Sequence, residues 1–523
     1  MKTTPRTALA GACAAALLLP AIAAHAAPDA TPHGPATSGS ALSVLDALHP
    51  APAPGAHTYV VAPDGSDDGP GTMAAPFRTL MRAQEAASAG DVVYLRGGVY
   101  DSFEVPETDN PFEDVYHYVN DISKSGITYA AYPGDPRPVF DFSSVPTDQR
   151  VAAFYIDTEV TDVNFVGFDV TGVKVGDQKQ SEAFRIAGGA NFVDMKAYGN
   201  EATGFYYTID GTGVVLNSDS YDNVAPTARA AGNSDGFGGH ANDVWFINDR
   251  AWNNSDDGFD SISSSGRVAH INDWSFGHHG NQDGVGDKNG FKVGGYAYRT
   301  TGLPDPIPVH TVVNSLSVDN GGNNFYANHQ PGQAASWINN TASDPGYGAN
   351  FNMLERVSPT SPENVAGFRE VLHGNLAYSG PLTSNDDTPA EDETGNSWTV
   401  DGGLPLADDD FVSLDTEQLT APRRADGGLP DVDLLKPVAG SAAEANGLGY
   451  LADDGDVRAT LTKLVDTFVR SGDVDAQGRA RLLGALRGED LSGFTSALET
   501  QQGPHVSQYA RTTLLLAAVG LQY

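Results

Sequence analysis

Short apolar segments separated by turns rich in Asn, Asp and Gly recur through the middle of the chain, about 22 to 42 residues apart. In six turns a polar residue stands three positions before a small one: Asp194/Ala197, Asn217/Ser220, Asn248/Ala251, Asn272/Ser275, Asn314/Ser317 and Asn339/Ala342. A second series places a phenylalanine after each pair: Phe205, Phe237, Phe259, Phe291, Phe325 and Phe351. Both series predict an all-β, right-handed parallel β-helix, in which each coil buries its apolar face against its neighbours.

In such a helix, residues at equivalent positions of successive coils lie above one another. We expect the Asn series to stack its amides at an internal turn, each satisfying the next, and the Phe series to stack in the core. These roles are structural. Leucine-rich and propeller repeats are the competing architectures, and the sequence lacks their signatures.

Different patterns flank the repeat. From Tyr59 to Tyr100 the sequence predicts a strand, a Gly/Pro/Asp loop, a helix near 80–89 and a second strand, which together form an N-terminal cap. From about Leu451 the apolar positions follow a helical period, first at Leu461, Leu464, Val465, Phe468 and Val469 and then at Phe494, Ala497 and Leu498. We therefore predict a β-helix domain over 57–450 and a small helical accessory module over 451–523.

The chain begins with features of an export signal. Lys2 and Arg6 precede an apolar stretch that ends at Ala24-His25-Ala26, so 1–26 is predicted to be a cleaved signal peptide. Residues 27–56, rich in Ala, Pro, Gly and Ser, are predicted to be a flexible leader. Cys13 is the only cysteine and lies within the signal, and no later apolar run is long enough to span a bilayer. We expect a secreted, extracellular monomer with no disulfide and no membrane partner.

Acidic residues dominate the composition. The formal net charge is −37, with 67 Asp and Glu against 30 Lys and Arg, which makes nucleic acid an unsuitable partner. Most of these acids are explained by solubility outside the cell, but a concentrated subset can bind cations.

The Phe series predicts where such a subset lies. Asp235 and Asp257 stand two positions before a stacked phenylalanine, and Asp260 and Lys292 stand one position after one. Because side chains alternate faces along a strand, Asp260 and Lys292 should point outward from neighbouring strands about 4.8 Å apart. Asp256 adds a carboxylate at the same turn. We expect all five groups on one outer surface of the β-helix.

Carboxylates this close repel one another unless a cation neutralises them, and several hard oxygen ligands suit Ca²⁺. No set of His and Cys at zinc spacing is present. Each Asp-Gly pair alone is ordinary turn chemistry, but four aspartates in two adjacent coils indicate a metal site. Lys292 is either a surface lysine paired with Asp260 or a catalytic base next to the cation.

Three segments in this order and spacing, SDGF at 234–237, NNSDDGFD at 253–260 and GDKNGFKVGG at 286–295, resemble the motifs of polysaccharide lyase family nine, the pectate lyases of the ten-coil β-helix type. The resemblance extends from Tyr59 to about residue 445. It implies calcium ligands at Asp235, Asp256, Asp257 and Asp260 and a catalytic base at Lys292. Lys288 departs from the motif, whose members more often have a small residue there.

The resemblance implies a calcium-dependent pectate lyase that cleaves an acidic polysaccharide, polygalacturonate or pectin, by β-elimination to 4,5-unsaturated products. Two other functions stay open. A β-helix glycoside hydrolase would use Asp256, Asp257 and Asp260 as acid and base and would need no metal. A non-catalytic surface protein would use the aspartates only to bind structural calcium. Pectate, methylated pectin and other uronate polymers are all open as substrates.

Overall fold

The computed structural model of the protein describes residues 55–106, 115–296, 303–328, 334–353, 370–450, 457–488, 490–500 and 505–522, together with Val44 and Pro52. All of them belong to one compact unit, residues 36–523. The predicted signal peptide lies outside the described residues, and so does the predicted leader apart from Val44, Pro52, Gly55 and Ala56. None of the described helices is long and apolar enough to cross a membrane.

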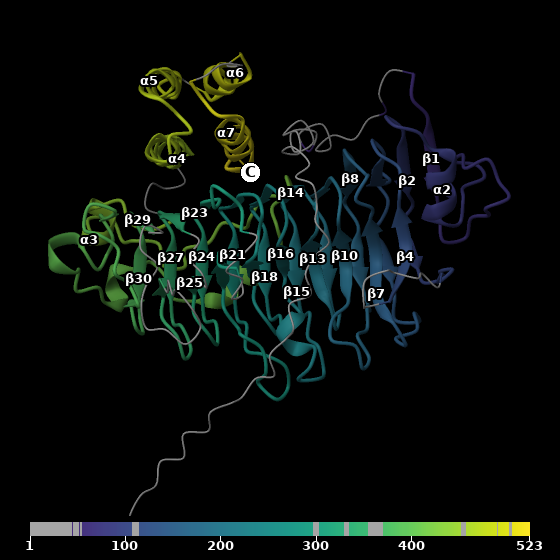
Figure 1. Ribbon diagram of the computed structural model, residues 1–523, viewed down its shortest axis with the longest axis horizontal. Coiled ribbons are helices and arrows are strands. Elements are labelled where there is room, and N and C mark those ends of the chain that lie inside the picture. Colours follow the sequence, from purple (N-terminus) through teal and green to yellow (C-terminus); the bar gives the residue numbers. More distant parts are fainter. Residues whose placement is uncertain are drawn as a thin grey trace, which may run out of the picture. The chain divides into compact units, whose positions relative to one another are not determined.

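Three parallel sheets form the body of the protein, and the chain visits them in turn, coil after coil, from the purple to the green end of Figure 1. Sheet I contains β1 (Thr58–Val61), β2 (Val92–Leu95), β5 (Thr128–Ala131), β8 (Val163–Val166), β11 (Ala190–Val193), β14 (Gly213–Leu216), β17 (Val244–Ile247), β20 (Val268–Ile271), β23 (His310–Val313), β26 (Ala335–Ile338), β29 (Val371–His373) and β32 (Glu393–Thr394). Sheet II contains β4 (Tyr116–Ile122), β7 (Arg150–Ile156), β10 (Glu182–Ile186), β13 (Thr203–Tyr207), β16 (Phe237–Gly239), β19 (Phe259–Ser261), β22 (Phe291–Val293), β25 (Phe325–Ala327), β28 (Phe351–Asn352) and β31 (Thr383–Ser384). Sheet III contains β3 (Gly98–Tyr100), β6 (Pro138–Asp141), β9 (Asp169–Thr171), β12 (Lys196–Tyr198), β15 (Asp219–Tyr221), β18 (Arg250–Trp252), β21 (Trp274–Phe276), β24 (Leu316–Val318), β27 (Thr341–Ser343) and β30 (Leu376–Tyr378). The predicted parallel β-helix is confirmed.

The predicted phenylalanine stack runs through sheet II. All six phenylalanines are fully buried, and neighbouring rings lie 4.7 to 5.1 Å apart from Phe205 to Phe351. The stack continues to Phe184 and Phe154 on the preceding coils. Stacked rings hold successive strands in one register, so the residues on either side of each phenylalanine are aligned as well.

The predicted asparagine series forms a ladder where each sheet I strand turns toward sheet III. Each amide Nδ2 donates to the Oδ1 of the preceding coil, from Asn248 to Asn217 at 3.0 Å and onward through Asn272, Asn314 and Asn339. These residues adopt φ values between 52° and 59°, a left-handed conformation that asparagine tolerates. The small residues three positions later pair with one another in sheet III.

Helices occur at both ends of the described chain. They are α2 (Leu80–Ala86), α3 (Ala442–Ala445), α4 (Val457–Arg470), α5 (Ala476–Ala485), α6 (Ser492–Thr500) and α7 (Gln508–Gly520), with 3₁₀ turns at Ala231–Asn233, Val400–Gly402, Asp408–Asp410 and Thr416–Thr420. The apolar stripes predicted for α4 and α6 are buried, except that Val469 is partly exposed. Helix α7 packs on sheet I, where Trp245 Nε1 donates to Thr513 Oγ1 at 2.8 Å and Asn248 Nδ2 donates to the Gly520 carbonyl at 2.6 Å.

Candidate functional site

The outward positions of sheet II bring the predicted residues together. Asp260 pairs in register with Gly238 on one side and with Lys292 on the other, as the phenylalanine spacing predicts. Phe259 and Phe291 point into the core, so the side chains that follow them point away from it. Asp235 and Asp257 lie in the turns that lead into β16 and β19.

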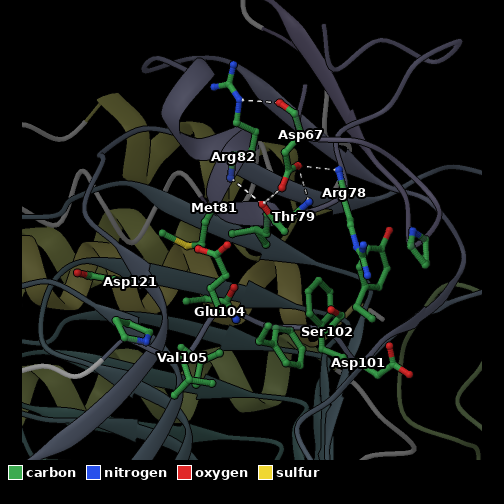
Figure 2. A pocket seen from close by; sticks show the side chains of 18 of the residues that line it. Asp67, Arg78, Thr79, Met81, Arg82, Asp101, Ser102, Glu104, Val105 and Asp121 are labelled. Carbon is green, nitrogen blue, oxygen red and sulfur yellow. Dashed lines mark hydrogen bonds between the residues drawn. The ribbon is translucent and has the colours of Figure 1, made fainter. Parts of the chain in front are cut away.

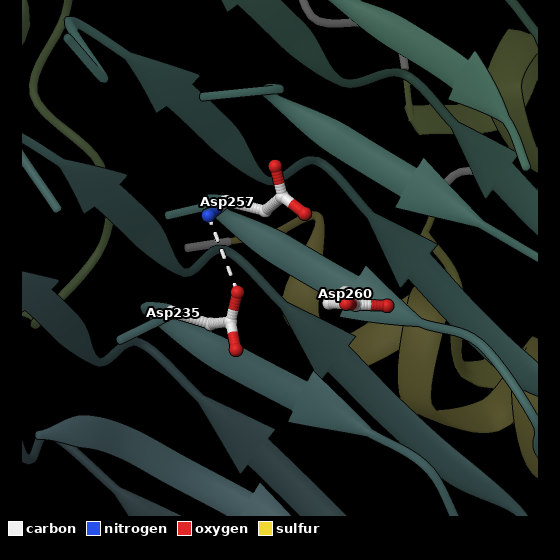
Figure 3. A group of neighbouring side chains, drawn as sticks. All are labelled: Asp235, Asp257 and Asp260. Atoms are coloured by element: carbon white, nitrogen blue, oxygen red, sulfur yellow. Dashed lines mark hydrogen bonds between the residues drawn. The ribbon is translucent and has the colours of Figure 1, made fainter. Parts of the chain in front are cut away.

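Asp235, Asp257 and Asp260 form a compact cluster (Figure 3), in which one carboxylate oxygen of each lies within 4.8 Å of the others. The Asp257 backbone N–H donates to Asp235 Oδ1 at 3.2 Å. Asn289, one coil further along, donates to Asp257 Oδ1 from its backbone at 2.8 Å and from its side chain at 2.9 Å. Backbone and amide donors from adjacent coils therefore fix the two carboxylates that the turns supply.

A second group of carboxylates shares Asp257. Oxygens of Asp256, Asp257 and Asp287 also lie within 4.8 Å of one another, and the Asp287 backbone N–H donates to Asp256 Oδ1 at 2.6 Å. Asp256 is thus in contact with the cluster through Asp257 rather than through Asp235 and Asp260. Asp287 is absent from the predicted set. The only signal for it is its place in the GDKNGFK segment, two residues before Asn289.

Lys292 lies among these carboxylates. Its Nζ is 3.1 Å from Asp257 Oδ2, 3.3 Å from Asp260 Oδ2 and 3.0 Å from Asp287 Oδ2. Burial lowers the pKa of Lys292, but the carboxylates of Asp257, Asp260 and Asp287 outweigh it and raise the pKa well above its usual value. These contacts therefore keep the lysine protonated near pH 7.

The carboxylates are more enclosed than predicted. Their side chains point away from the core, yet Asp257 is fully buried and Lys292 is only 8% exposed. Burial raises the pKa of Asp235 and of Asp256 well above the usual value, and the neighbouring aspartates add to this. For Asp257, burial raises the pKa to about 7, although Lys292 acts in the opposite direction. Such a cluster resists full ionisation without a cation.

His240 is a second neighbour that the sequence did not indicate. Its Nε2 lies 3.9 Å from Asp260 Oδ1, and its ring packs 5.1 Å from that of Tyr206. Burial lowers the pKa of His240, and the attraction of Asp260 only partly offsets this. The imidazole is therefore neutral near pH 7 and adds no positive charge to the carboxylates.

The donor set fits a hard divalent cation. All candidate ligands are carboxylate oxygens, which Ca²⁺ prefers. Asp257 Oδ2 is buried and accepts no hydrogen bond from the described residues, although Lys292 Nζ is 3.1 Å away, so it has coordinating capacity left. Among the residues that the structure describes, the two overlapping aspartate groups are the only clusters of three or more potential ligands.

A separate cavity of about 470 Å³ lies between α2 and β4 (Figure 2). Acidic, basic and apolar side chains line it, among them Asp67, Asp121, Arg78, Arg82 and Phe103. The Asp67 carboxylate already accepts hydrogen bonds from the backbone N–H groups of Arg78 and Thr79. Among the described residues, groups of three or more potential metal ligands occur only at the aspartate cluster and not in this cavity, so we place the candidate site at the aspartate cluster.

Comparisons with known proteins agree with this architecture. A sequence model described as "Pel9A-like, right handed beta helix region" matches residues 59–374. The chain is 29% identical over 447 residues to pectate lyase L of Dickeya chrysanthemi, covering 82% of this chain and 90% of that protein. Among solved structures, a rhamnogalacturonan lyase matches at 35% identity with a TM-score of 0.66, covering 76% of this chain and all of that one. Pectate lyase Pel9A matches at 27% identity with a TM-score of 0.59, covering 78% and 93%.

Proposed function

Because the chain belongs to the Pel9A-like right-handed β-helix family, as the resemblance to polysaccharide lyase family nine predicted, we propose that it is a calcium-dependent pectate lyase. The observation that carries the proposal is the contact of Lys292 with a buried group of aspartates on one face of the β-helix. The proposed substrate is polygalacturonate, which the enzyme cleaves by β-elimination. We further propose that it acts outside the cell as a monomer after residues 1–26 direct its export.

Asp235, Asp256, Asp257 and Asp260 would hold the calcium ion. When bound, calcium supplies a Lewis acid for the C6 carboxylate of the sugar, which makes the C5 proton more acidic, and it neutralises the aspartates. The aspartates are prepared for this role, because Asn289 and the backbone of Asp257 orient them before any ligand arrives. By holding a cation, the aspartates would also let an anionic polymer approach a strongly acidic protein.

Lys292 would be the general base. In its neutral form its Nζ takes the C5 proton, the electron pair of that C–H bond forms the C4–C5 double bond, and the C4–O bond breaks. The departing oxygen takes a proton from water. The Nζ lies 3.0 to 3.3 Å from carboxylates of Asp257, Asp260 and Asp287, which places the lysine directly beside the proposed metal ligands.

The two other functions make different demands on the same residues. A glycoside hydrolase that used Asp256, Asp257 and Asp260 would leave Lys292 without a role, and its products would lack the double bond. A non-catalytic calcium-binding protein would tolerate loss of the lysine. The lyase is the one of the three functions that gives both Lys292 and the aspartates a role, which supports it over the other two.

A second candidate substrate is rhamnogalacturonan, because the rhamnogalacturonan lyase matches with higher identity and TM-score than pectate lyase Pel9A. The same base and metal site would serve either polymer, since both reactions remove a proton next to a uronate carboxylate. The two candidates differ in the sugars that flank the cleaved bond.

The decisive experiment incubates the purified protein with polygalacturonate and, separately, with rhamnogalacturonan, each with calcium and with EDTA. We expect the ultraviolet absorbance of the conjugated double bond to rise with polygalacturonate and calcium, and not with EDTA. Greater activity on rhamnogalacturonan would make that polymer the substrate in place of polygalacturonate. New reducing ends without the absorbance would establish hydrolysis instead.

A further inference from the structure

Two side chains beside the aspartate cluster, Lys288 and Tyr347, form what we call the lip. Tyr347 is 69% exposed, although its hydroxyl donates to the Asp287 backbone carbonyl at 2.7 Å. Lys288 Nζ lies 5.4 Å from the centre of the Tyr347 ring. Asp287 in turn contacts Lys292 at 3.0 Å. A single exposed tyrosine is common, but here the ring is held at two points next to the proposed base.

The loops of three successive coils pack closely at the lip. Tyr347 precedes β28, two coils beyond Asp287, and the loop between them contributes Gly321 and Gly322. The Tyr347 backbone N–H donates to the Gly321 carbonyl at 3.1 Å, which stacks the two loops. A Cβ on Gly321 would lie 3.2 Å from Lys288 Cδ, and one on Gly322 would lie 2.6 Å from the Asp287 carbonyl oxygen. The absence of side chains at these two positions thus lets the loop pack directly against Lys288 and Asp287.

Lys288 is held as firmly as the tyrosine. It adopts a φ of 65°, which is uncommon for a lysine, and its Nζ donates to the Gly284 carbonyl at 2.8 Å. One bond to a carbonyl leaves the ammonium group two further protons to donate. Lys288 is also the residue at which the sequence departs from the motif of family nine.

We propose that the lip is a sugar-binding subsite adjoining the cleavage site, where the Tyr347 ring packs on a pyranose ring and the Lys288 ammonium binds the carboxylate of a uronate. This inference rests on the proposed function. Tyrosine offers a large, rigid and amphipathic surface, and the two tethers reduce the conformational entropy lost on binding. The ammonium adds attraction for an anionic polymer on a protein whose net charge is −37.

Kinetics of variants on polygalacturonate test the subsite. Tyr347→Ala should raise KM about ten-fold, the size of one lost ring contact, while kcat falls less than about three-fold. Tyr347→Phe, which keeps the ring, should recover most of that loss. Lys288→Ala should raise KM about two- to five-fold at low salt, with a smaller effect at high salt because the contact is exposed. The matched control is Lys174→Ala, an exposed lysine in the loop between β9 and β10, and it should match the wild type.

A binding measurement separates this inference from the proposed function. Calorimetric titration of polygalacturonate fragments into Lys292→Ala, with and without Tyr347→Ala, reports affinity without turnover, and the double variant should bind about ten-fold more weakly. Equal affinity in the two proteins, or a Tyr347→Ala enzyme with unchanged KM, would refute the proposal that the lip binds sugar, even if the wild type is a lyase. A wild type that is inactive on polygalacturonate, combined with the predicted difference in affinity, would reject the activity and keep the subsite. If neither protein bound the fragments, the proposed subsite would be refuted together with the activity.

Discussion

Replacing Lys292 with alanine should tighten calcium binding while it abolishes turnover. The Nζ lies 3.1 Å from Asp257 Oδ2 and 3.3 Å from Asp260 Oδ2, so it competes for two of the proposed ligands. At an effective dielectric constant of about 20, a pair of unit charges at such a distance interacts by about 5 kcal/mol. Water that enters the vacated space recovers most of this energy. We therefore expect a net gain of about 1.4 to 2.8 kcal/mol, or a Kd about ten- to a hundred-fold lower.

Isothermal titration calorimetry of EDTA-treated protein with calcium measures this change directly. Lys174→Ala is the control, since it removes one positive charge from the protein but none from the cluster, and its Kd should equal that of the wild type. The difference between Lys292→Ala and wild type should persist at high salt, because the groups involved are buried and poorly screened. Weaker calcium binding by Lys292→Ala would mean that the lysine supports the metal site instead of competing with it, and our assignment of the ligands would fail.

Four further results are expected. Asp260→Asn should raise the calcium concentration needed for half-maximal rate at least ten-fold in a rate titration, and magnesium should substitute poorly, because fewer charged oxygens hold the ion. With saturating calcium, kcat/KM should rise from about pH 7 toward 9 or 10 with the slope of one ionisation, since only neutral Lys292 accepts a proton; a maximum near pH 5 would contradict this. The pKa of Asp257, raised by burial to about 7, means that the folded state binds this proton more tightly than the unfolded state, so its stabilisation in EDTA is lost as pH rises from about 4 to 7. The thermal midpoint of Asp257→Asn should therefore rise relative to that of wild type over that range. A difference in midpoint that stayed constant with pH would contradict the raised pKa of Asp257. In denaturant unfolding, Asn248→Ala should lower the free energy of unfolding more than Asn272→Ala does, because of the two only Asn248 also donates to the Gly520 carbonyl. Equal decreases for the two variants would show that the bond to Gly520 does not stabilise the fold.

The spacing of repeated residues was sufficient to predict the core and the alignment of the site. Phenylalanine at equivalent positions fixes which face of each strand is buried, so the pairing of Asp260 with Lys292 followed from counting residues. The asparagine ladder followed in the same way, because its members share one turn and one backbone conformation. Both features depend on contacts between neighbouring coils, and the sequence period encodes them directly.

Features that depend on distant or irregular segments could not be predicted. Asp287 lies in a turn with no repeating partner, so no register indicated that its carboxylate reaches Lys292. The burial of Asp257 and Lys292 likewise depends on packing that the repeat spacing does not encode. The contact of Trp245 with Thr513 joins residues 268 positions apart, which helical periodicity does not reveal. The Tyr347 hydroxyl likewise bonds the Asp287 carbonyl across 60 positions, and no repeated residue marks that contact.

The most direct test of the proposed mechanism compares wild type, Lys292→Ala and Lys292→Arg on polygalacturonate at saturating calcium, with the initial rate of unsaturated product followed by ultraviolet absorbance. Circular dichroism should show that all three proteins are folded, since the side chain lies outside the core. We predict that both variants lose at least about 10² to 10⁴ in kcat, the contribution of a general base. A Lys292→Ala enzyme that kept a tenth of the wild-type rate would remove this residue from the chemistry.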